Sequence, residues 1–402
     1  MTEIETEPRP AVRLRPNVNA QSFRFGAPWA YADQLVMDRR TRGIPAGAVV
    51  ELQDAERRPL GAAAFNPDSK IAARMLDRDP AAPIDADWFA ARLARALALR
   101  ETLYDAPFYR LIHAEADGMP GVVIDRFGAA AVIQPNAAWA EARLPALVEA
   151  FRAVTGVTTV IKNGSGRARS LEGLTEASEV LSGGVEAPVP VPMNGATYLA
   201  DLLGGQKTGL FYDQRPNHAF AARLGRGRSV LDVFSHVGGF ALAALAGGAR
   251  GALAVDGSAP ALDLATRGAE ASGVAHAFET RRGDAFETMA ALGEEGRRFG
   301  LVVCDPPAFA PSKPALEAGL RAYERVARLG AALVEPGGFL VLCSCSHAAD
   351  LPRFREASLR GVGRAGRAAQ ILGVGGAGPD HPAHSHLAES VYLKALFLRL
   401  DG

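Results

Sequence analysis

The chain has 402 residues, with 44 Lys and Arg balanced by 44 Asp and Glu. Hydrophobic residues make up 48% of it and charged residues 22%, which excludes a mostly disordered chain. The length favours two or three domains. The zero net charge excludes a uniformly basic protein, so any surface that binds nucleic acid must be local.

Cysteine usage and the N-terminus indicate the compartment. Three cysteines are too few for a disulfide framework, and the first seven residues are acidic without an apolar core, unlike a signal peptide. The longest uncharged run, residues 233–249, contains His236 and several glycines, and it indicates strand, loop and helix, not a membrane span. We therefore expect a cytoplasmic protein without a membrane partner.

The first part of the chain, residues 1–78, has the pattern of a small β-barrel. Strand-like segments at 12–15, 48–52, 59–65 and 71–76 are separated by turns rich in Asn, Asp, Gly and Pro. Between Arg9 and Arg78 there are 12 basic and 7 acidic residues, a local excess of five positive charges. This excess fits either a solvated arginine-rich face or a surface that contacts RNA.

Residues 79–190 have the pattern of an α+β domain. A helix is predicted over 89–104, and a second over 138–154, among strands at 109–114, 121–125, 130–134 and 157–162. A boundary is predicted where Gly183 and Gly184 are followed by alternate prolines up to Pro192.

Residues 191–402 alternate strands with helices. Strands are predicted at 230–234, 252–255, 301–304 and 339–343, and helices from 240, over 315–334, and between an N-cap at Ser258 and a C′ glycine at Gly273. This alternation indicates an α/β fold with a doubly wound, mostly parallel sheet.

The segment Leu231–Phe240 resembles a ligand-binding turn between a strand and a helix. Gly238 and Gly239 would let a ligand approach the backbone, and Asp256 at the next strand end could accept hydrogen bonds from a ribose. The turn lacks G-x-G-x-x-G, and Asp232 would repel a pyrophosphate, which disfavours a dinucleotide. A sulfonium nucleoside with an amino group fits better, although a generic helix-capping turn gives the same pattern.

Two further strand ends carry polar groups. Asp284 could bind the exocyclic amine of adenine with Phe286 near the ring, although Gly-Asp is also a common turn. Asp305 begins D-P-P-A-F-A-P-S-K, in which Pro306 and its successor fix a rigid turn. The Asp305 carboxylate could then hold a planar base in the cleft.

Cysteine, threonine and histidine residues complete the candidates. Cys345 follows a strand and could act as a nucleophile, whereas Cys343 and Cys304 are expected in the core. The segment 207–215, with Thr208 and Asp213, could lie across the cofactor cleft. The histidines at 381, 384 and 386 suggest a loop more than a metal site, so no metal is expected.

Taken together, D-x-F-x-x-x-G-G-F, Asp256, G-D-A, D-P-P-x-F-x-x-x-K and S-C-S resemble class I S-adenosylmethionine-dependent methyltransferases. More closely, the chain resembles the bacterial 23S rRNA cytosine-5 methyltransferase group of the RlmI type, over nearly its whole length. Segments 26–29, 65–74, 117–125, 207–215 and 389–394 also match this group. The resemblance implies an N-terminal PUA domain, a central α+β domain and a C-terminal Rossmann-like methyltransferase domain.

The resemblance also implies the partners and the site. The cofactor would be S-adenosyl-L-methionine and the substrate ribosomal RNA; a homodimer is left open. Cys345 would be the nucleophile and Asp305 would face the target base. The residues that would bind the cofactor or shape its pocket are Thr208, Asp213, Phe234, Ser235, Gly238, Gly239, Asp256, Asp284, Phe286, Asp305 and Pro306.

One departure and two alternatives accompany this hypothesis, so that three interpretations of the chain are open in all. Many RNA cytosine-5 methyltransferases have a second cysteine where this chain has Ala308, so another base or water would have to release the product. The D-P-P stretch also resembles rRNA guanine-N7 methyltransferases, which need no cysteine. A non-catalytic RNA-binding assembly factor is the third interpretation.

Overall fold

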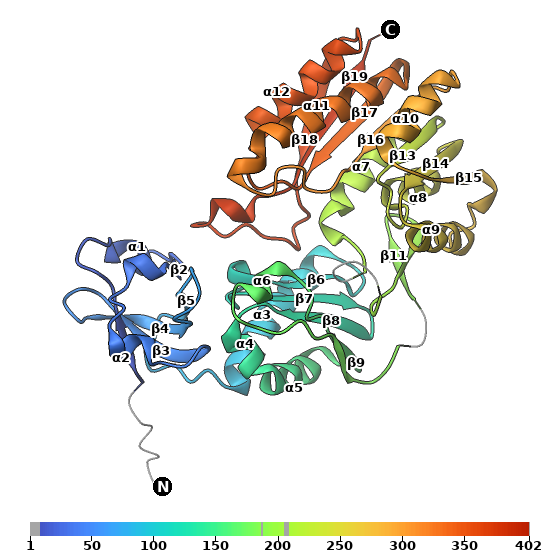
Figure 1. Cartoon of the computed structure of the whole chain (residues 1–402). Helices are drawn as coiled ribbons and strands as arrows, with labels where there is room; N and C mark the ends of the chain where they lie inside the picture. The colour runs from blue at the N-terminus through green and yellow to red at the C-terminus, as the bar shows by residue number, and fades with distance from the viewer. Residues whose placement is uncertain (1–8, 186–187, 205–208, 402) are drawn as a thin grey trace. The chain divides into compact units, whose positions relative to one another are not determined.

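The computed structural model describes residues 9–185, 188–204 and 209–401 (Figure 1). The chain divides into a first unit, residues 1–186 with 382–388, and a second unit, residues 187–381 with 389–402. The first unit contains two sheets but is not divided further. The domain boundaries predicted at 78/79 and 190/191 therefore stay a prediction. No helix in the described ranges has the length and apolar character needed to span a bilayer.

The N-terminal sheet of the first unit confirms the predicted β-rich fold. Its strand order is β1-β3-β4-β5-β2. The strands are β1 (Ala11–Arg13), β2 (Trp29–Ala30), β3 (Ala48–Gln53), β4 (Pro59–Phe65) and β5 (Ala73–Asp77), and two short helices are α1 (Ala20–Arg24) and α2 (Arg39–Arg42). The four predicted strands are present, whereas β2 and both helices were not predicted.

The second sheet of the first unit has the order β10-β9-β8-β7-β6. Its strands are β6 (Phe108–His113), β7 (Val122–Phe127), β8 (Ala130–Pro135), β9 (Thr159–Lys162) and β10 (Glu179–Ser182), with helices α3 (Ala86–Leu103), α4 (Ala138–Ala142), α5 (Leu144–Thr155) and α6 (Arg167–Ser170). The single helix predicted over 138–154 is wrong. It breaks at Arg143 because Pro145, in the first turn of α5, has no N–H to continue α4.

Glu172 connects the two sheets within the first unit. Its buried carboxylate accepts hydrogen bonds from Ser69 Oγ (2.8 Å) and Asn66 Nδ2 (3.1 Å), and an ion pair from Arg74 Nη2 (3.0 Å). A charged group buried in this way is stabilised only while its partners remain, so these contacts hold the two sheets together.

The second unit is built on a seven-stranded sheet in the order β15-β14-β13-β16-β17-β19-β18. Its strands are β13 (Ser229–Val233), β14 (Gly251–Asp256), β15 (Phe278–Arg282), β16 (Phe299–Cys304), β17 (Val334–Ser344), β18 (Ala369–Gly375) and β19 (Lys394–Leu400). Strands β15, β14, β13, β16 and β17 are parallel, and β19 is antiparallel to both neighbours. This confirms the predicted doubly wound α/β fold.

Helices cover both faces of this sheet. They are α7 (Arg215–Gly225), α8 (Gly239–Ala246), α9 (Ala259–Ala271), α10 (Ala285–Glu294), α11 (Leu316–Ala332) and α12 (Leu351–Arg364), and a separate hairpin is formed by β11 (Val189–Met193) and β12 (Ala196–Ala200). The predicted N-cap Ser258 and the C′ residue Gly273 are both confirmed. Helices α11 and α12 lie side by side on one face (Figure 1).

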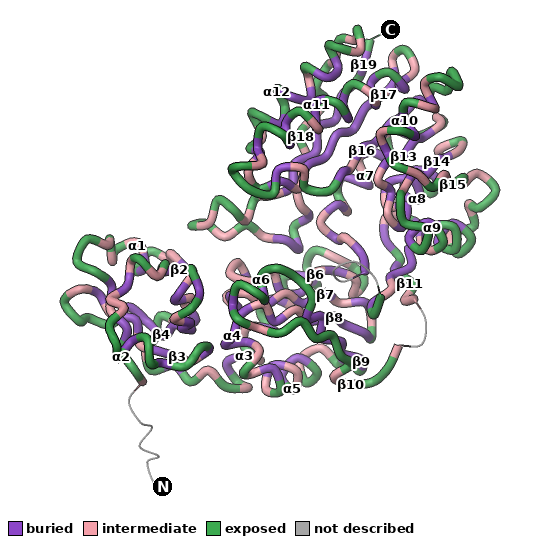
Figure 2. Tube along the Cα trace, in the orientation of Figure 1, coloured by how far each residue is buried: buried purple, intermediate pink, exposed green. Residues whose placement is uncertain are grey.

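The side chains of alternate strand residues pack into two separate cores, one on each face of the sheet. Val302, Cys304 and Leu342 lie in the core that also contains α10, α11 and α12, whereas Val303 and Cys343 lie in the core with α7 and α8. The strands are therefore buried on both faces (Figure 2), as expected of a covered parallel sheet. Because β13, β14, β16 and β17 run in parallel, their carboxyl ends meet at one edge, where ligands bind in this class of fold.

Candidate active site

The loop after β13 has an unusual backbone. Phe234 (φ 63°), His236 (φ 50°) and Gly238 (φ 80°) all adopt left-handed conformations, and Gly238 caps α8. Two of these residues are not glycine, and such strain commonly marks a functional loop. At Gly239 a Cβ atom would lie 2.7 Å from His218 Nε2, so the first residue of α8 must be glycine.

Asp256 holds this loop against the end of β14. Its Oδ2 accepts from His236 N (2.9 Å), and its Oδ1 accepts from Ser258 N (2.8 Å). The carboxylate is half-buried, so it has acceptor capacity left for a ligand hydroxyl.

Two buried oxygens beside the loop have no hydrogen-bond partner among the described residues: Asp232 Oδ1 and Ser235 Oγ. The second Asp232 oxygen accepts from Ala241 N at 2.9 Å. Burial raises the pKa of Asp232 to about 7, and the charge of Asp256 adds to the increase. Buried polar atoms without partners are rare in folded chains, and these two fit a polar ligand seated on the loop.

Asp284 and three phenyl rings form the next part of the site. Asp284 is exposed and caps α10 by accepting from Phe286 N (2.9 Å) and Glu287 N (3.0 Å) through Oδ1. Phe234, Phe286 and Phe309 lie with centroids 6.1 to 6.4 Å apart. The N-capping role of Asp284 was not predicted, since the alternative given for it was a common Gly-Asp turn. The three rings offer an apolar surface for a planar ring such as adenine.

Asp305 lies at the end of β16, where its N–H donates to Val233 O (3.2 Å) and so extends the pairing with β13. Gln214 Nε2 donates to Asp305 Oδ2 at 2.9 Å, and Asn217 Nδ2 donates to Gln214 Oε1 at 2.6 Å. Pro306 is buried beside it. The carboxylate is thus held by a short chain of amides, while Ala308 is exposed.

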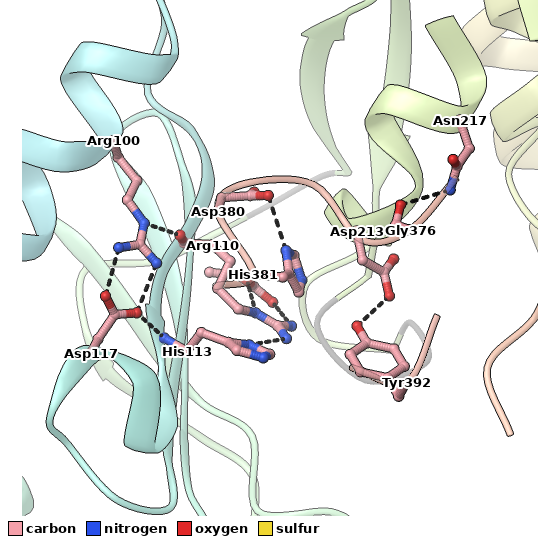
Figure 3. Close-up of polar contacts among 11 residues, drawn as sticks. Arg100, Arg110, His113, Asp117, Asp213, Asn217, Gly376, Asp380, His381 and Tyr392 are labelled. Carbon is pink, nitrogen blue, oxygen red and sulfur yellow. Dashed lines mark hydrogen bonds and ion pairs between the residues drawn. The ribbon is translucent and has the colours of Figure 1, made fainter. Parts of the chain in front are cut away.

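The segment before α7 contributes Asp213. Tyr392 donates its hydroxyl to Asp213 Oδ2 at 2.5 Å (Figure 3). In the same figure Asn217 Nδ2 donates to Gly376 O, at 3.0 Å. Thr208, a predicted cofactor contact, lies outside the described residues.

The three cysteines differ in exposure. Cys304 and Cys343 are buried, and burial raises the pKa of both thiols. Cys345 is partly exposed, one residue beyond the end of β17. A thiol must be reachable and ionisable to act as a nucleophile, and among the three only Cys345 meets the first condition.

The two serines beside Cys345 lie in the core. Ser344 and Ser346 are both fully buried. Ser344 Oγ donates to Tyr323 OH (2.9 Å), Tyr323 OH is hydrogen bonded to Ser346 Oγ (2.7 Å), and Ser346 Oγ accepts from Ala310 N (2.9 Å). These hydroxyls fix the backbone on both sides of the thiol.

Sequence reasoning missed three residues of this site. Phe309 was named only as part of the D-P-P motif, and Tyr323 lies on a helix that gave no functional signal. Lys394 Nζ donates to the carbonyls of Ser346 and Ala349, at 2.6 and 2.7 Å. The alternating K-A-L-F-L-R-L pattern from Lys394 could have predicted the final strand and so placed this lysine beside the end of β17.

The histidine-rich segment is a loop, as predicted. His381 Nδ1 is hydrogen bonded to Asp380 Oδ1 at 3.0 Å, and both side chains are buried. Within the described residues, no group of three or more His, Cys, Asp and Glu side chains comes together to hold a metal ion.

Comparison with protein families agrees with this geometry. Residues 12–78 match the model of a PUA-like domain, and residues 149–367 match that of an S-adenosylmethionine-dependent methyltransferase. A Streptococcus mutans protein described as an S-adenosylmethionine-dependent methyltransferase has the same fold, with a TM-score of 0.81 at 18% identity over 97% of this chain and 100% of its own. A second methyltransferase, solved with S-adenosylhomocysteine, also has a TM-score of 0.81, at 19% identity over 98% and 100%.

Fold and site therefore define a class I S-adenosylmethionine-dependent methyltransferase. Ribosomal RNA large subunit methyltransferase I of Photobacterium profundum is 36% identical over 93% of this chain and 95% of its own length. Ribosomal RNA large subunit methyltransferase of Deinococcus radiodurans is 35% identical, with 98% of each chain covered. The chain belongs to this family of ribosomal RNA large subunit methyltransferases, and its cofactor is S-adenosylmethionine.

Proposed function

We propose that the chain transfers a methyl group from S-adenosylmethionine to carbon 5 of a cytosine in ribosomal RNA, through a covalent adduct with Cys345. The observation that carries this proposal is the partly exposed thiol of Cys345 at the strand edge that also carries Asp305. The names of the relatives support ribosomal RNA as the substrate.

The loop after β13 and the phenyl rings would bind the cofactor. In this assignment, Asp256 accepts from the ribose, Asp232 and Ser235 offer their unpartnered oxygens, and the rings pack near the adenine. The bound cofactor supplies an electrophilic methyl group on a sulfonium. Gly238, Gly239, Asp284, Pro306, Thr208 and Asp213 remain proposed contacts or pocket residues.

The chemistry needs a nucleophile because carbon 5 of cytosine is a poor one. The Cys345 thiolate adds to carbon 6, which makes carbon 5 enamine-like; carbon 5 then takes the methyl group, and S-adenosylhomocysteine leaves. Asp305, held by Gln214, stabilises the adduct through the ring nitrogen or amine. A base removes the carbon 5 proton, and elimination of the thiolate restores the ring and frees Cys345.

The base that removes the proton is not a second cysteine. Ala308 stands at that position and is exposed, and the other two cysteines are buried. The proposal therefore requires another base or a water molecule for this step.

RNA would be held by the domain predicted over residues 1–78, of which residues 12–78 match a PUA-like domain and residues 9–78 carry the local excess of positive charge. Contacts of arginine with phosphate give affinity with little sequence information. The target cytosine must leave its stack to reach the strand edge.

The first test maps the product. RNA from cells with and without the gene is digested and analysed by mass spectrometry, and the purified enzyme is incubated with labelled cofactor and RNA. We expect 5-methylcytosine at one site. A methylated guanine would assign the chain to the N7 alternative, and no methyl transfer would leave a non-catalytic assembly factor.

The second test addresses the adduct. RNA containing 5-fluorocytosine should trap a covalent complex, because fluorine cannot leave as a proton does. Cys345→Ala should abolish both trapping and turnover, and Cys343→Ala, the buried control, should retain both. A Cys345→Ala enzyme that methylates cytosine at nearly the wild-type rate would contradict the covalent mechanism.

A further inference from the structure

Lys394 is a buried lysine at the turn that follows Cys345. It begins β19 directly opposite Ser344 of β17, and its residue exposure is 7%. Its ammonium donates to Ser346 O (2.6 Å) and Ala349 O (2.7 Å), one and four residues beyond the thiol. Lys394 therefore fixes the backbone that leaves Cys345, while Tyr323 fixes the neighbouring serine hydroxyls.

The charge of Lys394 is not neutralised by a carboxylate. None of the carboxylates among the described residues forms an ion pair with it, and both of its hydrogen-bond acceptors are neutral carbonyls. Burying an ammonium without a counter-charge is costly, so lysines are almost never fully buried unless paired. A lysine in this position needs an explanation that packing alone does not give.

The hydrogen bonds of Lys394 to Ser346 O and Ala349 O place its ammonium on the turn that begins at Cys345, where the charge of a thiolate acts on it. Burial lowers the pKa of Lys394, and the negative charges of Cys345 and then Asp350 oppose this change. Asp350 is exposed, and its Oδ1 accepts from Arg353 N (2.9 Å) as the N-cap of α12. The thiolate form of Cys345 is thus the anion that a buried lysine here would favour.

The other titratable groups around Cys345 do not replace this cation. Burial raises the pKa of Tyr323, whose hydroxyl is therefore neutral at physiological pH. Asp305, at the end of β16, is an anion and would oppose a second negative charge. His347, whose ring lies 5.6 Å from that of Tyr392, carries charge only when protonated.

We propose that Lys394 is a positioning residue that favours the thiolate form of Cys345 and fixes the turn on which the thiol is presented. This inference deepens the proposed function, since it rests on Cys345 as the nucleophile. A cation beside a thiol stabilises the thiolate, and that form is the nucleophile. A larger fraction of Cys345 is then ready to add to carbon 6 without a general base.

The test measures the rate of Cys345 alkylation by iodoacetamide against pH in the full-length protein, without RNA. A free cysteine has a midpoint of about 8.5. In the wild type, we expect the midpoint of Cys345 alkylation to lie about one pH unit below that value. Lys394→Met should raise the midpoint by about one unit, and Lys394→Arg, which keeps the charge, should restore most of the shift. Lys70→Met, at an exposed lysine of the first unit, is the matched control and should change nothing.

The midpoint distinguishes an electrostatic role of Lys394 from a purely structural one. If Lys394 only held the backbone, its substitution would change the limiting alkylation rate at high pH and leave the midpoint unchanged. Cys345→Ala gives the background of the two buried thiols. Equal midpoints for wild type and Lys394→Met would overturn the inference. Misfolding of Lys394→Met would be revealed by calorimetry as a failure to bind S-adenosylhomocysteine. In that case the wild-type midpoint alone tests the proposal, and a value at or above about 8.5 rejects it.

Failure of this inference and failure of the proposed function are separable. A lowered midpoint together with a methylated guanine would retain the Lys394 effect on the thiol and reject the cytosine assignment. An ordinary midpoint together with trapping on 5-fluorocytosine would retain the covalent mechanism and reject the role of Lys394.

Discussion

Asp232 is a residue of the candidate site whose burial lowers the stability of the folded protein. Its carboxyl group is fully buried under the loop after β13, with one oxygen lacking a partner among the described residues. Its pKa of about 7 means that the folded protein holds a proton there over a pH range in which the unfolded chain, with a value near 3.8, has lost it. Stability must therefore fall as pH rises between these two values.

We predict that Asp232→Asn changes the pH dependence of stability. The amide cannot ionise, so the variant lacks the penalty that wild type acquires as pH rises from 4 to 7. The free energy of unfolding of the variant, relative to wild type, should increase over this range by a few kcal/mol, since each pKa unit corresponds to about 1.4 kcal/mol. Urea unfolding of the cofactor-free proteins at pH 4.5 and pH 8 measures this difference. A difference that is constant with pH would show that Asp232 ionises normally.

Asp256 is predicted to bind the ribose of the cofactor. Asp256→Ala should weaken S-adenosylmethionine binding about 10- to 150-fold, equivalent to about 1.5–3 kcal/mol for a pair of charge-assisted hydrogen bonds. Calorimetry measures the affinity. Because Asp256 also accepts from His236 N and Ser258 N, Asp256→Asn serves as the control that keeps the shape and one acceptor oxygen. If Asp256→Ala binds as wild type does, the ribose is recognised elsewhere.

At the scale of elements, α2 concentrates the positive charge of the N-terminal sheet. Asp38 caps it, and Arg39, Arg40 and Arg42 are all exposed. We predict that changing the three arginines to Gln lowers RNA affinity and reduces the dependence of log K on log salt by about 2, because each lost phosphate contact removes about 0.7 on single-stranded RNA. Filter binding between 50 and 200 mM salt measures both quantities.

A matched variant carries the same charge change on the second unit: Arg267, Arg281 and Arg297 to Gln, all at partly exposed positions. It should retain more of the RNA affinity than the α2 variant, and S-adenosylhomocysteine should bind both equally. Equal loss in the two variants would mean that RNA is attracted by overall charge and not by the PUA-like sheet.

The fold of this protein was largely predictable where sequence periodicity is strong. The apolar run of β14 ends at Asp256, that of β16 ends just before Asp305, and β13 leads into the glycine-containing loop that begins at Phe234. The elements after residue 350 were not predicted. The pairing of β18 shifts register between Ile371 and Gly373, which weakens its strand pattern, whereas α12 was overlooked although Asp350 and Pro352 mark its start. Helix α11 ends two residues before the predicted end at Val334, which already belongs to β17 and pairs with Phe299 of β16.

The candidate site could be predicted only in part. Residues at strand ends are found from sequence because parallel strands bring their carboxyl ends together. The roles of Tyr323 and Lys394 depend on pairing between β17 and β19 and on the packing of α11, which no local pattern specifies. The burial of the flanking serines could not be predicted either, because small polar side chains are equally suited to an opening and to a buried hydroxyl network.

At the scale of the whole molecule, the first unit is assembled from two distant pieces of chain. Residues 382–388 belong to it, although 195 residues of the second unit separate them from Glu186. The fit is close, since a Cβ added at Gly26 would lie 3.4 Å from His386 Cε1. A fragment that ends before residue 382 therefore lacks part of the first unit, so surface substitutions test RNA binding more cleanly than deletions do.

This arrangement also determines the order in which the two units can be completed during synthesis. At the usual elongation rate of about 5–20 residues per second, the segment 382–388 leaves the ribosome roughly 10–40 s after residue 186. During that interval the first unit can form both of its sheets, but the place beside Gly26 stays empty. Completion of the first unit therefore waits until most of the second unit has been synthesised.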